Sequence, residues 1–72
     1  MPDKRTIEEI PLKDIQMLTA KVLKISGVPL ETTLGTIYAL GSEKRLLATF
    51  LLWAYDNHPT EEQVLHWIVE HT

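Results

Sequence analysis

The chain has 72 residues, of which 44% are hydrophobic and 24% charged, and its formal net charge at neutral pH is −3. This length permits one domain and excludes two, and the composition excludes an intrinsically disordered chain. The sequence contains no cysteine, so it offers no disulfides and nothing suggests an oxidising compartment. We therefore expect a cytoplasmic protein.

Glycine and proline residues divide the chain into four segments of helical periodicity, and no segment alternates convincingly as a strand. We predict an all-α fold, a compact bundle of four short helices over about residues 11–26, 29–40, 43–56 and 61–71. Residues 1–10 are expected to form a partly ordered N-terminal extension. Residues 11–72 are expected to form a single helical domain.

The first predicted helix begins near Pro11 and ends before Gly27, a residue suited to a left-handed stop. Its apolar residues recur at helical spacing and predict the face that packs in the core: Ile15, Leu18, Val22 and Ile25. The opposite side carries one apolar residue among three lysines: Met17, with Lys13, Lys21 and Lys24.

The second predicted helix ends before Gly41 and has two different sides. One is an apolar stripe of Leu30, Leu34, Ile37 and Tyr38. The other has small side chains that permit close approach of another backbone: Thr32, Gly35, Thr36 and Ala39. Because glycine costs about 1 kcal/mol relative to alanine inside a helix, we predict a packing role for Gly35.

The third predicted helix contains ten consecutive uncharged residues, from Leu46 to Tyr55. This run is half of the about 20 residues that a membrane-spanning helix needs, so we predict no membrane span. Ser42 is a suitable N-cap, and Asn57 is a suitable stop. Since most of its circumference is apolar, this helix is predicted to lie at the centre of the bundle.

The fourth predicted helix begins with a capping box, Thr60-Glu-Glu-Gln63. Its inward residues are predicted to be Val64, Leu65 and Ile68, with Trp67 at the edge of this stripe. His66 shares the outer face with Glu62 and Glu70, but a transition-metal site needs further ligands. Because no other histidine has a matching spacing, we predict no metal site.

No pattern in the sequence indicates catalysis or a cofactor. The hydroxyl groups of Ser42 and Thr60 are explained by helix capping, and a nucleophile also needs an adjacent base. The three glycines are spread through the chain and do not form a phosphate-binding loop. We therefore predict that the protein is not an enzyme and binds no cofactor.

The apolar residues exceed what four short helices can enclose, which favours a protein-interaction module. We predict that it binds a protein partner or self-associates as a homodimer. The aromatic edge of the third and fourth helices and the small-residue side of the second are the candidate surfaces. The candidate partner-binding residues are Trp53, Tyr55, Trp67, Gly35, Ala39 and Met17.

 In this set Gly35 and Ala39 represent the small-residue side of the second helix, and Met17 belongs to the first.

An alternative function is that of a nucleic-acid accessory protein. It would use the basic side of the first helix, and its candidate residues are Lys13, Lys21, Lys24, Lys44 and Arg45. The second and third helices resemble the outline of a helix-turn-helix, but a recognition helix presents polar and basic side chains to the bases, whereas the third helix is core-like. From Leu46 to Thr72 there are four acidic residues and no Lys or Arg, which disfavours phosphate there.

Overall fold

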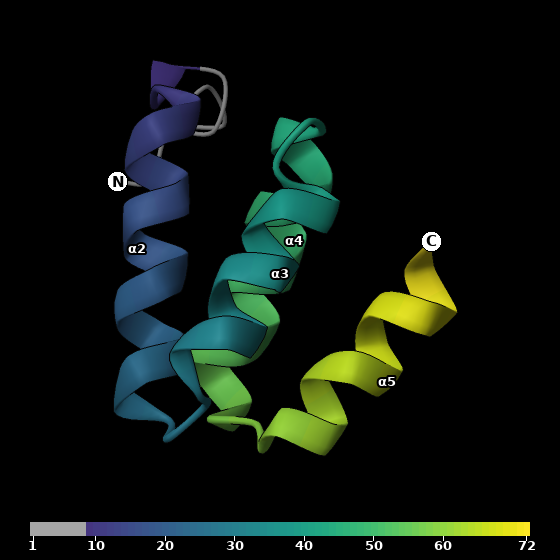
Figure 1. Ribbon diagram of the computed structural model, residues 1–72. Coiled ribbons are helices and arrows are strands. Elements are labelled where there is room, and N and C mark those ends of the chain that lie inside the picture. Colours follow the sequence, from purple (N-terminus) through teal and green to yellow (C-terminus); the bar gives the residue numbers. More distant parts are fainter. Residues whose placement is uncertain (1–8) are drawn as a thin grey trace.

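The computed structural model describes residues 9–72. This part of the chain forms four helices and no strand: α2 (Leu12–Ile25), α3 (Leu30–Leu40), α4 (Lys44–Asn57) and α5 (Glu61–His71) (Figure 1). The all-α prediction is confirmed, and each predicted boundary lies within one residue of the observed one. The predicted N-terminal extension falls outside the described residues except at positions 9 and 10.

Successive helices run in opposite directions, so α2 and α4 are parallel (Figure 1). Their C-terminal ends lie together, since the Ser26 hydroxyl oxygen is 3.5 Å from Nδ1 of His58. Helix α3 contacts α2, α4 and α5. In Figure 1, α2 and α5 lie on opposite sides of α3.

Helix α4 lies at the centre of the core, as its apolar sequence predicts. It contributes four of the ten buried hydrophobic residues: Leu47, Ala48, Phe50 and Ala54. The other six come from α2, α3, α5 and the α2–α3 loop: Ile15, Leu23, Val28, Leu40, Val64 and Trp67. The uncharged run, residues 46–55, is not buried on every side of the helix, because Leu52 and Tyr55 are exposed.

Two predicted helix signals are confirmed in atomic detail. Gly27 has a φ of +88°, the left-handed conformation that glycine adopts without a steric penalty. At the start of α5, the Gln63 amide donates to the Thr60 hydroxyl at 3.3 Å, and the Thr60 amide donates to the Gln63 side chain at 3.0 Å. These reciprocal bonds are the capping box.

Two other predicted signals at the ends of α4 are wrong. Ser42 is not the N-cap, because Glu43 occupies that position. Asn57 is the last helical residue, and its side-chain amide donates to the Trp53 carbonyl at 2.8 Å. The left-handed stop is therefore His58, with φ 45° and ψ 62°.

Helix α2 is rotated relative to the predicted orientation, so part of its predicted core stripe is wrong. Ile15, Thr19 and Leu23 are buried, whereas Leu18 and Ile25 are exposed. The Thr19 hydroxyl donates to the Ile15 carbonyl at 2.7 Å. Because this bond satisfies the hydroxyl within the helix, threonine can pack in the core like a small apolar residue.

In α3, too, threonines face the core where larger apolar residues are expected. Thr33 and Thr36 are buried, and their hydroxyls donate to the carbonyls of residues 29 and 32 at 3.1 Å and 2.8 Å. The apolar stripe instead lies outside, with Leu30, Leu34 and Tyr38 at 72%, 57% and 89% exposure. In α5, Leu65 is likewise exposed, contrary to prediction, and Trp67 is buried in its place.

Candidate interaction surface

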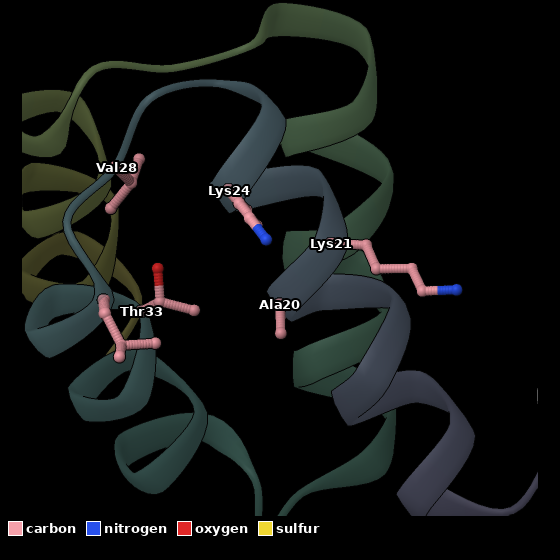
Figure 2. Close-up of a pocket in the computed structure, with 6 residues that line it drawn as sticks. Ala20, Lys21, Lys24, Val28 and Thr33 are labelled. Atoms are coloured by element: carbon pink, nitrogen blue, oxygen red, sulfur yellow. The ribbon is translucent and has the colours of Figure 1, made fainter.

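A groove lies between the second half of α2 and the first half of α3, beside the loop that joins them. Its volume is about 330 Å³, and its lining residues are Ala20, Lys21, Lys24, Val28, Leu30 and Thr33. In Figure 2, Ala20, Val28 and Thr33 border the space between the two helices, and Lys21 extends away from Val28 and Thr33. The groove is thus apolar inside and basic along its α2 edge.

The loop between α2 and α3 fixes the shape of this groove. After the left-handed turn at Gly27, the Val28 amide donates to the Leu23 carbonyl at 2.9 Å, and the Val28 side chain is buried. Pro29 then precedes α3 with a φ of −59°, an angle that its ring already favours. The loop therefore holds the Val28 side chain and the start of α3 at one end of the groove.

The apolar stripe of α3 extends the groove along the surface of the helix. Leu30 belongs to both features, and Leu34 and Tyr38 follow it at intervals of four residues, one helical turn each. Single exposed hydrophobic residues are common on soluble proteins, whereas a contiguous row is typical of a binding surface. We call this groove and the residues Leu34 and Tyr38 the α2–α3 face.

The outer side of α2 continues this face with mixed chemistry. A shallower cavity of about 230 Å³ is lined by Asp14, Met17, Leu18 and Lys21. Met17 is 52% exposed. Of the predicted partner-binding residues, Met17 is therefore accessible, and it lies close to a lysine that also borders the groove.

The predicted aromatic edge is mostly internal. Trp67 is only 7% exposed, and its ring lies 5.0 Å from that of Phe50 and 6.0 Å from that of Trp53. The His71 ring stacks on the Trp67 ring, with the ring centres 3.8 Å apart. Trp53 is half-buried, and only Tyr55 is largely exposed. The three aromatic residues therefore do not form one accessible edge.

The small-residue side of α3 faces α5 in part. The Thr32 hydroxyl donates to the Glu61 carboxylate, which joins the two helices near their N-terminal ends. Ala39 lines a third cavity of about 330 Å³ between the last turn of α5 and the α3–α4 connection, which is also bordered by His71. Gly35 is exposed, and a Cβ atom there would contact nothing within 4 Å. The predicted packing role of Gly35 thus has no counterpart within the described chain.

The five basic residues of the nucleic-acid alternative lie at two ends of the molecule. Lys21 and Lys24 lie near the C-terminal end of α2, whereas Lys44 and Arg45 form the first turn of α4. Because α2 and α4 are parallel with their C-terminal ends together, the centres of the two pairs are about ten residues, or about 15 Å, apart along the helix axes. Lys13 lies at the start of α2.

The two histidines of α5 interact with residues of the same helix. His66 Nε2 lies 3.6 Å from a Glu70 carboxylate oxygen one turn later, and both side chains are exposed. His71 Nδ1 is 2.8 Å from the Trp67 carbonyl oxygen. Within residues 9–72, no three His, Cys, Asp or Glu side chains are grouped to hold a metal ion.

Sequence reasoning missed the exposed role of Leu30, Leu34 and Tyr38. The signal that could have identified them is the threonine row on the opposite side of the same helix, because threonines spaced to bond their own helix can face the core.

None of the helices in the described part is both long and apolar enough to span a membrane. Comparisons of the chain with protein-family models, with curated proteins and with solved structures found no match.

Proposed function

We propose that this chain is a small, non-catalytic cytoplasmic protein-interaction module that binds an amphipathic, acidic helix on its α2–α3 face. The observation that carries the proposal is the exposed row of Leu30, Leu34 and Tyr38 beside an apolar groove. Binding of a helix in a groove uses apolar anchors spaced one turn apart. The α2–α3 face offers apolar contacts at that spacing.

The lysines at the groove determine the preferred charge of the bound helix. Lys21 and Lys24 are exposed at the edge of the groove. Opposite charges across an interface steer encounter and set the register, and like charges exclude the wrong partner. An acidic helix is therefore favoured over a basic one with the same apolar side.

The proposal is tested by NMR titration of the ¹⁵N-labelled chain with two synthetic helical peptides. Both peptides carry the same leucine stripe, and the polar side holds glutamates in one and lysines in the other. We expect the acidic peptide to shift the amide signals of Ala20, Lys24 and Leu34 and to bind at least about tenfold more tightly than the basic one. If neither peptide shifts these signals at a protein concentration at which the chain is monomeric, the proposal is wrong.

A matched pair of variants shows whether binding uses this face. Leu34→Glu places a charge in the exposed row, and Tyr55→Glu makes the same change at an exposed position of α4. We expect Leu34→Glu to abolish peptide binding and Tyr55→Glu to leave it unchanged. Equal loss in both variants would contradict the assignment of the face.

The same titration distinguishes the nucleic-acid alternative. An oligonucleotide bound by the lysines of α2 would give salt-dependent shifts at those residues. It would not need the apolar row, so Leu34→Glu would bind it as well as the unmodified chain does. Oligonucleotide binding without peptide binding would favour that alternative over the proposed function.

A further inference from the structure

Helix α5 has an outer side whose chemistry complements the α2–α3 face. Glu62, Leu65 and Val69 follow one another at intervals of three and four residues, which places them in one row on the helix surface. Leu65 and Val69 are 50% and 75% exposed, and Glu62 is exposed as well. This row is thus an acidic, apolar helix side of the kind proposed above as the ligand.

The contacts of α5 with its own chain use its other side. Val64 and Trp67 are buried against the core, and the Glu61 carboxylate accepts the hydrogen bond from Thr32. These contacts fix the helix to α3 and to the aromatic residues of α4. The row of Glu62, Leu65 and Val69 is consequently presented outward on a helix that its own core holds in place.

The positions of the two complementary surfaces suit a symmetric pair. In Figure 1, α2 and α5 flank α3 on opposite sides. A second copy, related by a two-fold axis that runs beside α3, would have its α5 opposite α2 of the first copy and its α2 opposite α5. In such an arrangement each contact occurs twice, as the symmetry of a dimer requires.

We infer that the occupant of the α2–α3 face is α5 of a second copy of this chain. Leu65 and Val69 pack against the groove and the apolar row of α3, and Glu62 lies near Lys21 and Lys24. This inference rests on the proposed function, and it names the partner. A stable interface takes about 20 residues from each side. The six lining residues of the groove are too few for this, but the reciprocal contact also includes residues of α3 and α5 from both copies.

Sedimentation equilibrium of the full chain with a charge exchange tests the inference. One variant carries Lys21→Glu and Lys24→Glu, and the other carries Glu62→Lys. Each variant alone brings like charges together, so we expect its self-association to be at least about tenfold weaker than that of the unmodified chain. A mixture of the two pairs opposite charges at both contacts, so we expect a heterodimer of nearly the original affinity.

Two control variants keep the result interpretable. Val69→Glu removes an exposed apolar contact of the proposed interface and is expected to give a monomer, whereas Leu52→Glu makes a similar change on α4 and is expected to dimerise normally.

A monomeric unmodified chain that still binds the acidic peptide would overturn the inference and leave the proposed function standing. A chain that neither dimerises nor binds the peptide would overturn both. Dimers that do not respond to the charge exchange would also contradict the inference.

Discussion

At the scale of single residues, Trp67 shows how the fold changes the role of an aromatic side chain. Trp67 lies at the edge of the apolar stripe in sequence, but Phe50, Trp53 and His71 surround its ring in the structure. Its burial links α5 to the central helix. We therefore assign Trp67 to the stability of the fold and not to partner binding.

We predict that Trp67→Ala loses about 3–5 kcal/mol of unfolding free energy, the usual cost of removing a buried aromatic ring. A small domain has little more than this in total, so we expect a largely unfolded variant by circular dichroism and urea titration. Trp67→Phe keeps a ring and should remain folded. Tyr55→Ala, at an exposed position, should change stability by at most about 0.5 kcal/mol. Equal losses for Trp67→Ala and Tyr55→Ala would contradict the burial of Trp67.

His58 is a second residue whose role depends on its backbone conformation. A non-glycine residue in the left-handed region costs about 1–2 kcal/mol, and His58 has a φ of 45°. We predict that His58→Gly raises the unfolding free energy by about 0.5–1 kcal/mol, because glycine removes the steric cost but gains freedom in the unfolded chain. The measurement is the midpoint of urea unfolding.

His58→Ala is the control for this prediction, because it removes the ring and its contact with Ser26 but keeps the Cβ atom. We expect no stabilisation from alanine. If glycine destabilises the protein as much as alanine does, the contact of the ring matters more than the backbone angle.

At the scale of the helix, the sequence predicts where elements begin and end better than how they are rotated. Helix boundaries depend on local chemistry, such as the conformation of Gly27 and the capping box at Thr60, which neighbouring residues determine. The rotation of α2 and α3 depends on what the other helices offer. A hydrophobic stripe predicts the buried side of a helix because burying a polar side chain normally costs desolvation free energy. Thr19 and Thr36 avoid this cost, since their hydroxyls donate to carbonyls of their own helices.

The same reason explains which part of the candidate site could be predicted. The exposure of Met17 and of the lysines of α2 is predictable from their spacing alone. The exposure of the α3 row is not, because an apolar stripe is normally the core side of a helix. The groove depends on the distance between two helices, which no local pattern encodes.

A pair of substitutions two residues apart tests the rotation of α3. Thr36 is 1% exposed and Leu34 is 57% exposed. We predict that Thr36→Glu unfolds the protein, because it buries a carboxylate without a partner. Leu34→Glu should change the stability of the monomer by at most about 1 kcal/mol. Urea unfolding at a low protein concentration measures both, and unfolding by Leu34→Glu with tolerance of Thr36→Glu would reverse the assignment.

At the scale of the whole molecule, we propose that folding and binding use different sides of the helices. Folding uses the sides of the helices that face α4, including the threonine rows. The proposed binding uses the apolar residues that this arrangement leaves outside on α3 and α5, beside charged groups of opposite sign on α2 and α5. A dimer formed in this way stabilises the folded state by mass action.

The dependence of the melting temperature on protein concentration tests this central claim most directly. For a chain of this size, each kcal/mol gained by association raises the melting temperature by about 4–8 °C. We predict that the melting temperature of the unmodified chain rises with concentration, whereas that of Leu34→Glu stays constant. A melting temperature of the unmodified chain that is independent of concentration, or an equal rise in both proteins, would contradict dimer formation through the α2–α3 face.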